Sequence, residues 1–162
     1  MGWATVVRSP VVRRAAAVMV LSCAGVAGIV KHEATVPIVY QDVIGINTVC
    51  TGHVTKLAVG TRVSGDTCAQ LLQEDTAIAQ SSIRRGVKTQ ISQNQYDALT
   101  SLVFNIGTGA FASSTLLRKL NADDCHGAAA EFTRWNRGGG RVLRGLTNRR
   151  ASERALFEQD CP

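Results

Sequence analysis

The chain has 162 residues, with 18 Lys or Arg against 12 Asp or Glu, so its formal net charge is +6. This length allows one domain plus a short appendage and buries about two thirds of the unfolded surface, so no metal or disulfide scaffold is needed for folding. The positive charge favours an anionic partner, which could be nucleic acid, a membrane surface or a bacterial wall polymer.

The N-terminal segment has the pattern of a membrane-directed sequence. Arg8, Arg13 and Arg14 precede an uncharged run over residues 15–30, and Lys31 closes that run. The positive-inside bias then places the N-terminus in the cytoplasm. As a helix the run would span roughly 24 Å, which is short for a hydrocarbon core of about 30 Å. Most of its residues are Ala, Gly, Ser or Cys, so we expect weak insertion.

Three fates of this segment remain open from its composition. A secretory signal would be cleaved near the small residues Gly25 and Ala27, and a lipoprotein signal would be cleaved before Cys23. The third fate is an uncleaved anchor that later leaves the bilayer, which explains the many small residues. Glu33 follows Val30 by three residues, so an anchored chain would hold Glu33 against the lipid headgroups.

The next stretch predicts a β-hairpin that carries two polar side chains. β-branched and aromatic residues flank Gly45, which favours a hairpin that turns near this glycine. Asp42 and Thr48 are then expected to face each other across the strands. Glu33 precedes Pro37 and is expected at the end of the preceding element.

This fold-back could bring the carboxylates of Glu33 and Asp42 together. In an inverting glycosidase two carboxyl groups lie roughly 6.5–9.5 Å apart, one as proton donor and the other as the base for a water molecule. Thr48 could hydrogen-bond that water. The alternative interpretation is two solvated surface charges and an ordinary strand threonine.

The remaining chain predicts a mostly helical lobe without repeats. Ser92 and Gln95 have the spacing of a capping box and predict the central core helix, which ends at Gly107. Other expected elements are a loop over 60–65, a helix capped by Asp66 or Thr67 that continues through 78, a glycine-rich loop over 107–112, a helix over 115–120, a helix from 123 or 124 to about 135, a loop over 137–141 and a helix over 146–158. A small β element followed by helices indicates an α+β fold.

The cysteines and basic residues leave further alternatives. The five cysteines include no Cys-x-x-Cys pair, which favours an exported protein with two disulfides and one unpaired thiol over a cytosolic protein with free thiols. His53 has no second histidine at ligand spacing, so a structural role is favoured over metal binding or base catalysis. A cluster of arginines over residues 134–154 could bind nucleic acid, but no nucleic-acid motif accompanies it, so wall binding or solvation is favoured.

Together these motifs resemble the phage lysozyme-type endolysins of glycoside hydrolase family 24, and in particular their lambdoid signal-anchor-release (SAR) branch. The most specific part is the spacing of three residues: eight residues separate Glu33 from Asp42, and five residues separate Asp42 from Thr48. The sequence that follows Thr48 also matches, as far as His53. The resemblance covers residues 31–161 and, with the anchor, nearly the whole chain. Further matching positions are Gln95, Ala98, Leu99, Ser101, Phe104, Asn105, Gly107, Gly109, Phe111, Ser114, Thr115, Leu116, Leu117, Trp135, Gly145, Leu146, Arg149, Arg150 and Glu153.

The resemblance implies an α+β lysozyme-like fold with a small β-hairpin lobe and a larger helical lobe. It implies a signal-anchor helix within residues 1–30 and a catalytic domain over 31–162. The implied enzyme is a lysozyme (muramidase) that cleaves the β-1,4 bond between N-acetylmuramic acid and N-acetylglucosamine in peptidoglycan during host cell lysis. No cofactor and no metal are implied, and the enzyme is expected to be a monomer that does not bind nucleic acid.

The resemblance also assigns roles to individual residues. Glu33 would be the general acid, Asp42 the partner carboxylate and Thr48 the residue that places water. Arg149 would lie beside Glu33 as an ionic support, and the remaining supporting residues would be His53 and Asn105. Two departures from the family pattern are Ala34, where a glycine is usual after the catalytic Glu, and Asn47, where an aromatic residue is common.

Regulation is implied by the SAR branch. The enzyme would stay inactive at the host inner membrane through residues 15–30 and enter the periplasm after a holin or pinholin collapses the membrane potential. Some SAR enzymes have a disulfide-blocked catalytic Cys where this chain has Asp42, so tethering itself should inhibit here, with Cys23 at most helping to lock the released form. The preferred disulfides are Cys50–Cys68 and Cys125–Cys161.

The rival from another class is a non-catalytic peptidoglycan-binding module exported by a signal peptide or lipid anchor. A third candidate is a basic nucleic-acid-binding protein in the cytoplasm.

Overall fold

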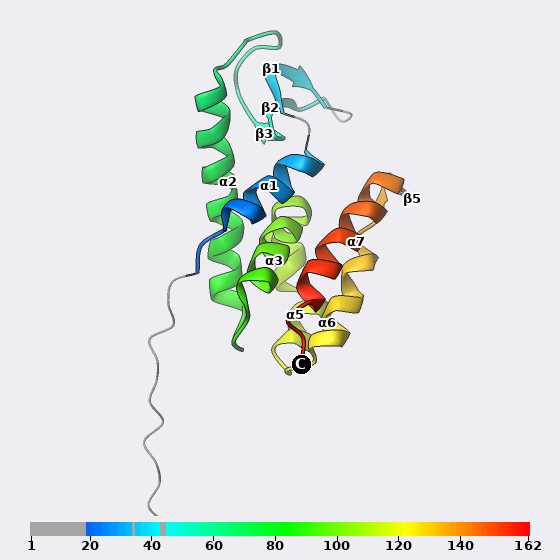
Figure 1. Ribbon diagram of the computed structural model, residues 1–162. Helices are drawn as coiled ribbons and strands as arrows, with labels where there is room; N and C mark the ends of the chain where they lie inside the picture. The colour runs from blue at the N-terminus through cyan, green and yellow to red at the C-terminus, as the bar shows by residue number, and fades with distance from the viewer. Residues whose placement is uncertain (1–18, 34, 43–44) are drawn as a thin grey trace, which may run out of the picture.

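Figure 1 shows the computed structural model, which describes residues 19–33, 35–42 and 45–162. The basic flank with Arg8, Arg13 and Arg14, the start of the expected anchor, and Ala34 lie outside the described residues. Within the described ranges the first helix is α1 (Cys23–His32), which continues beyond the expected anchor boundary at residue 30. No helix of the described chain is long and apolar enough to cross a bilayer, so the expected transmembrane helix is not seen in this part of the protein.

The β lobe is a three-stranded antiparallel sheet in the order β1-β2-β3. Its strands are β1 (Val36–Gln41), β2 (Asn47–Cys50) and β3 (His53–Val54). Thr48 pairs with Tyr40 and not with Asp42, so the predicted facing pair was wrong. Asp42 lies in the turn, where its backbone N–H donates to Ile46 O and its Oδ1 accepts from Ile46 N at 2.9 Å. Because an aspartate side chain at the start of a turn readily accepts a nearby backbone N–H, it fixes a tighter turn than the glycine position suggested.

The helical lobe follows the β lobe and is connected to it by a long helix. Figure 1 shows α2 running from the sheet along one side of the helical lobe, with α1 and α7 on different sides of α3. The elements are α2 (Gly65–Gly86), α3 (Gln93–Ile106), α4 (Thr108–Ala112), α5 (Thr115–Leu120), α6 (Cys125–Glu131), η1 (Phe132–Arg134), β4 (Arg137–Gly138), β5 (Arg141–Val142) and α7 (Arg144–Glu158).

The start and end of α3 confirm the local signals in the sequence. Ser92 and Gln95 form both hydrogen bonds of the capping box, and Gly107 ends the helix with a φ of 86°, a value that glycine adopts without steric cost. Helix α5 also has the predicted bounds. The expected loop over 107–112 was wrong, because residues 108–112 form α4. Ser64, and not Asp66 or Thr67, caps α2, and the expected loop over 137–141 contains the β4–β5 hairpin.

Helix α3 is the centre of the main hydrophobic core. Its residues Leu99, Leu102 and Val103 are fully or almost fully buried and pack with residues of α2, α4, α5, α6, η1 and α7. A second, smaller core lies under the sheet, with Val39, Val49, Cys50 and Cys68. The β lobe therefore has its own small core, and α2 links it to the larger one.

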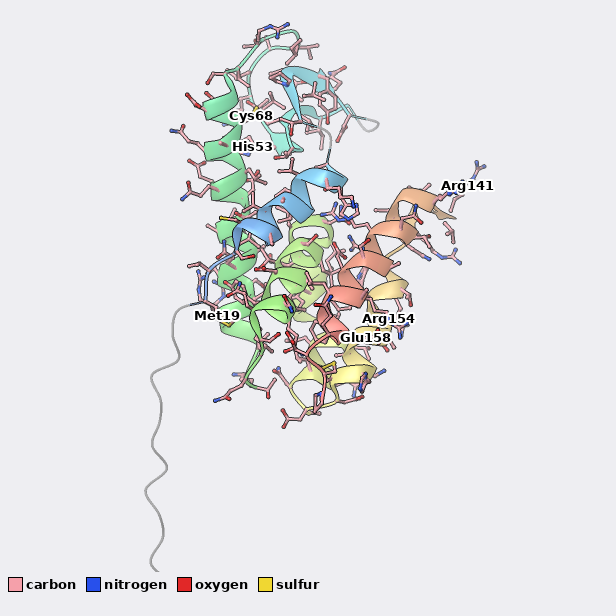
Figure 2. All side chains as sticks on the ribbon, in the orientation of Figure 1. Met19, His53, Cys68, Arg141, Arg154 and Glu158 are labelled. Carbon is pink, nitrogen blue, oxygen red and sulfur yellow. A yellow bond between two sulfur atoms is a disulfide. The ribbon has the colours of Figure 1, made fainter. Side chains whose placement is uncertain are left out.

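Both predicted disulfides are confirmed. Cys50–Cys68 ties β2 to α2 (Figure 2), and Cys125–Cys161 ties the start of α6 to the C-terminus. Cys23 is exposed and forms no disulfide.

Candidate active site

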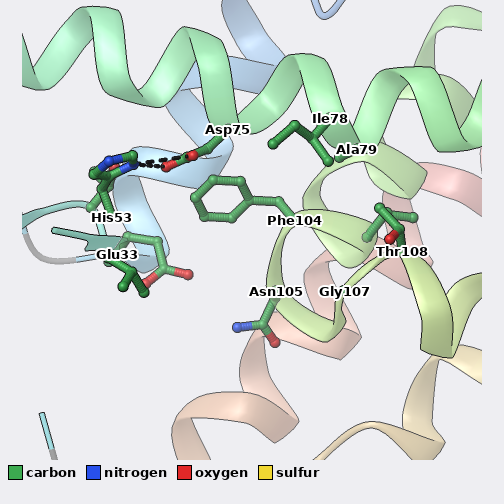
Figure 3. Close-up of a pocket in the computed structure, with 13 residues that line it drawn as sticks. Glu33, His53, Asp75, Ile78, Ala79, Phe104, Asn105, Gly107 and Thr108 are labelled. Atoms are coloured by element: carbon green, nitrogen blue, oxygen red, sulfur yellow. Dashed lines mark hydrogen bonds and ion pairs between the residues drawn. The ribbon is translucent and has the colours of Figure 1, made fainter. Parts of the chain in front are cut away.

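A cleft of about 540 Å³ lies where α1, β3, α2 and α3 meet (Figure 3). The end of α1 supplies one wall, β3 and α2 supply another, and the end of α3 supplies a third. Its lining residues are Glu33, Thr51, Gly52, His53, Val54, Asp75, Ile78, Ala79, Val103, Phe104, Asn105, Gly107 and Thr108.

Glu33 is positioned by the end of α1. It is the C-cap of this helix, and its backbone N–H donates to Ile29 O at 3.0 Å. Its side chain is 24% exposed, and Nη1 of Arg149 donates to its Oε1. Arg149 is only 4% exposed at its side chain. The carboxylate of Glu33 therefore faces the cleft while a buried cation holds one of its oxygens.

A buried network of charges lies behind this contact. Nε of Arg149 donates to Oε1 of Glu153 at 3.0 Å, and Nη2 of Arg149 donates to the carbonyl oxygen of Ser101 at 3.2 Å. Ser101 Oγ donates to the same Oε1 at 2.6 Å, and Nε of Arg150 lies 3.0 Å from Glu153 Oε2. The charges of Glu33 and Glu153 balance those of Arg149 and Arg150, which a buried network requires because an uncompensated charge there is costly.

Burial shifts the two inner charges of this network. It raises the pKa of Glu153, an effect that the neighbouring Arg150 opposes. Burial also lowers the pKa of Arg150 to about 10, an effect that Glu153 opposes. A guanidinium with this pKa still carries its charge at neutral pH, so Arg150 remains a pure hydrogen-bond donor.

A second polar pair lies on the wall of the cleft that β3 and α2 supply (Figure 3). Nδ1 of His53 on β3 is 3.0 Å from Oδ2 of Asp75 on α2, and both side chains are about one quarter exposed. This contact connects the sheet to the long helix, as a structural histidine would. Among the described residues no cluster of three or more His, Cys, Asp or Glu is placed to hold a metal ion.

The structure brings some of the predicted site residues together and leaves others apart. Glu33, His53 and Asn105 line the cleft, and Arg149 lies directly behind Glu33. Asp42 and Thr48 lie on the hairpin and are not among the described residues that line this cleft. Thr48 is buried, and its Oγ1 donates to Ile46 O at 3.1 Å.

Sequence reasoning missed two features of the site. Asp75 was taken only as part of a helix, and no local signal connects it to His53, 22 residues earlier. The network role of Glu153 was also missed. Its spacing of four from Arg149 and three from Arg150 is the spacing at which helical side chains meet, so this contact could have been found.

Comparisons with known proteins agree with this architecture. The model of the phage lysozyme family matches residues 30–153. An endolysin of Acyrthosiphon pisum secondary endosymbiont phage 1 is 43% identical over 123 residues, which cover 74% of this chain and 84% of that protein. A SAR-endolysin of Enterobacteria phage P21 is 39% identical over 118 residues, 72% of each chain. A crystal structure of a P22 lysozyme mutant superposes with a TM-score of 0.77 and 38% identity, over 86% of this chain and 98% of that one.

The α+β fold with its interlobe cleft is thus lysozyme-like. The chain belongs to the phage lysozyme family. It is a lysozyme, a glycoside hydrolase that acts on peptidoglycan.

Proposed function

We propose that this lysozyme is a phage endolysin that cleaves the β-1,4 bonds between N-acetylmuramic acid and N-acetylglucosamine, with residues 31–162 as its catalytic domain. The observation that carries the proposal is the position of Glu33, whose carboxylate lies on the wall of an open cleft and is held by the buried Arg149. A carboxyl group in such a position can protonate the glycosidic oxygen of a sugar chain bound in the cleft.

Asp42 and Thr48 complete the proposed catalytic set. Asp42 is the partner carboxylate and Thr48 the residue that places the attacking water. Asp42 is fixed in the hairpin turn by the N–H of Ile46, and the first strand of that hairpin begins three residues after Glu33. Because the buried hydroxyl of Thr48 donates a hydrogen bond to Ile46 O, the lone pairs of its oxygen remain able to accept a hydrogen bond from a water molecule placed beside it.

The proposal includes control by the membrane. Residues 15–30 hold the newly made chain at the host inner membrane with its N-terminus in the cytoplasm, until holin or pinholin action lets the segment leave the bilayer. The likeness to a SAR-endolysin supports this order of events. After release, residues 23–32 form α1 on the enzyme body, and Glu33 reaches the cleft because it caps that helix.

The catalytic part is tested with Glu33→Gln, which keeps the shape of the side chain and its contact with Arg149 but removes the acidic proton. Release of reducing ends from purified peptidoglycan should fall at least about 100-fold, since a general acid contributes two to four orders of magnitude. Glu74→Gln is the matched control, because Glu74 is exposed on α2 away from the cleft lining. If Glu33→Gln still cleaves at the wild-type rate, or if the wild type binds peptidoglycan without cleaving it, the endolysin proposal is wrong and a binding module is favoured.

The membrane part is tested with Ala24→Leu combined with Ala27→Leu. Both alanines are exposed in the folded protein, so the purified variant should retain its activity, while the added apolar surface strengthens insertion by about 0.8 kcal/mol per buried methylene. In cells, the wild type should move from the membrane fraction to the periplasm when the membrane potential is dissipated, with Met1 or Gly2 as its first residue by mass, and the variant should remain in the membrane. Equal release of both proteins, or a wild-type N-terminus near Cys23 or Gly28, would contradict the anchor proposal.

A further inference from the structure

The cleft contains one exposed amide whose orientation is set from inside the protein. Asn105 lies in the last turn of α3 and lines the cleft. Its Oδ1 accepts a hydrogen bond from Nη2 of Arg150 at 3.1 Å. An asparagine on a surface can usually turn its amide by half a rotation and exchange donor for acceptor. The partner of Asn105 decides whether that exchange is possible here.

Arg150 permits only one orientation of this amide. A guanidinium has donors and no acceptor, so only the oxygen end of Asn105 can face it. Arg150 is 1% exposed and is itself fixed by Glu153, with Nη2 at 3.1 Å from Oε1 and Nε at 3.0 Å from Oε2. Its pKa of about 10 keeps it charged at neutral pH. The contact therefore has no alternative protonation state in which the amide could turn over.

The amide nitrogen of Asn105 is consequently directed away from Arg150. Figure 3 shows Nδ2 turned toward the side of the cleft on which Glu33 lies, with Oδ1 on the other side. Its N–H groups donate to no acceptor in the described part of the chain. An exposed donor of fixed direction is thus present on the wall of the cleft, where a bound ligand can accept from it.

The same buried carboxylate fixes both this donor and the acid. Oε1 of Glu153 accepts from Arg149, which holds Glu33, and from Arg150, which holds Asn105. The side chains of Arg149, Arg150 and Glu153 are each at most 4% exposed. Glu33 and Asn105 are therefore both held by one buried group of side chains, although they come from the ends of α1 and α3.

We propose that Arg150 is a positioning residue of the cleft, which turns the Asn105 amide so that its N–H groups bind an oxygen acceptor of the glycan. The inference rests on the proposed function, since it takes the ligand to be a peptidoglycan sugar chain. Arg150 acts through Asn105 and does not itself line the cleft. A donor in a preformed direction favours ligands with an acceptor at that point, because a ligand without one leaves the N–H groups unpaired.

The donor is tested first with Asn105→Asp and Asn105→Ala. The aspartate keeps the shape of the side chain and gains an ion pair with Arg150, but it has no N–H group, and the alanine removes the donor without adding a charge. Both variants should lose at least about 10-fold in kcat/KM, mainly through a higher KM, and the aspartate variant should not have a lower Tm than the wild type. Asn94→Asp is the control, because the side chain of Asn94 donates to Gln159 at the surface and is not among the described residues that line the cleft. Wild-type kcat/KM in both Asn105 variants would overturn the proposal.

The role of Arg150 is tested with a double-mutant cycle. Arg150→Lys keeps the charge but lacks the planar fork that contacts Glu153 and Asn105 together. The Arg150→Lys substitution should lower kcat/KM at least about 5-fold when Asn105 is present, and less than about 2-fold when Asn105 has been replaced by alanine. Equal losses in both backgrounds would show a merely structural role. Arg154→Lys, at a partly exposed pair on the same helix, is the matched control.

Binding to purified peptidoglycan, measured by sedimentation, separates this inference from the proposed function. If the wild type does not cleave the polymer, the proposed function fails, but weaker binding by Asn105→Ala would still support the contact. If the wild type cleaves and Glu33→Gln does not, while the Asn105 variants bind and cleave normally, only the contact is refuted.

Discussion

Helix α3 is held from two sides by contacts of different chemistry. We call the first set of contacts the N-terminal seam: residues 20–22 lie against Gln80 of α2 and against Gln93 and Asp97 of α3. Asp97 accepts hydrogen bonds from the backbone N–H of Ser22 at 3.1 Å, from the Ser22 hydroxyl and from Gln93 Nε2 at 2.8 Å. The C-terminal seam consists of Arg149, Arg150 and Glu153 of α7 against Ser101 and Asn105.

The two seams differ in the groups that bind their buried carboxylates. Asp97 is 4% exposed and is met by neutral donors, whereas Glu153 is met by two guanidinium groups. Hydrogen bonds from neutral donors to a charge contribute about 1.5–3 kcal/mol, and breaking a buried ion pair costs about 3–5 kcal/mol. The N-terminal seam is thus held by hydrogen bonds from neutral groups and contains no buried ion pair among these residues, which suits a segment proposed to dock only after it leaves a membrane.

The largest effect is expected at the C-terminal seam. Glu153→Gln leaves two buried guanidinium groups with only Glu33 to balance them, so the free energy of unfolding should fall by about 3–5 kcal/mol in chemical denaturation. Glu158→Gln, which removes the partly exposed partner of Arg154 (Figure 2), should cost less than about 1 kcal/mol. A loss at Glu153 no greater than that at Glu158 would remove the contrast between the seams.

A smaller effect should distinguish two glycines of α1 at the N-terminal seam. A Cβ at Gly25 would lie 2.8 Å from Cγ of Asp97 and 2.6 Å from Cδ1 of Leu21, whereas a Cβ at Gly28 meets nothing within 4 Å. Gly25→Ala should therefore lower the free energy of unfolding by about 1–3 kcal/mol. The Asp97 carboxylate cannot easily move away from the added methyl group, because three hydrogen bonds hold it in place. Gly28→Ala should stabilise by about 0.5–1 kcal/mol. Equal shifts in Tm for the two variants would mean that α1 does not pack on Asp97 as described.

The smallest effect concerns the end of α1, where the charge of Arg149 in the C-terminal seam acts on His32. Burial and, next, the charge of Arg149 lower the pKa of His32, the last residue of α1. The folded state therefore favours the neutral imidazole, and the resulting stability is present above the ordinary pKa of about 6.5 and is lost as the pH falls through the lowered value. His32→Asn should show a smaller drop in Tm between pH 7 and pH 5 than the wild type. His126→Asn, at an exposed position, should keep the wild-type drop, and an unchanged drop in both would contradict the prediction.

Local signals predicted those parts of the fold whose causes lie within a few residues. The capping box of Ser92 and Gln95 and the stop at Gly107 depend on hydrogen bonds and backbone angles of neighbouring residues, and they were predicted correctly. The hairpin register was not, because the side chain of Asp42 closes the turn onto Ile46 and moves Thr48 opposite Tyr40. Residues 108–112 were predicted as a loop from their glycine content, yet they form α4, whose Phe111 is completely buried in the core.

The sequence by itself determined the α+β order of elements, the cysteine content, and the spacing of Glu33, Asp42 and Thr48. Apart from the Arg149–Glu33 pair, which the family resemblance implied, only the tertiary structure decided which polar groups meet. Ser22 reaches Asp97 across 75 positions, and Arg149 reaches Ser101 across 48. Such contacts depend on how the apolar faces of the helices pack around α3, because the orientation of each helix is fixed mainly by its buried side chains and not by the polar residues that this packing brings together.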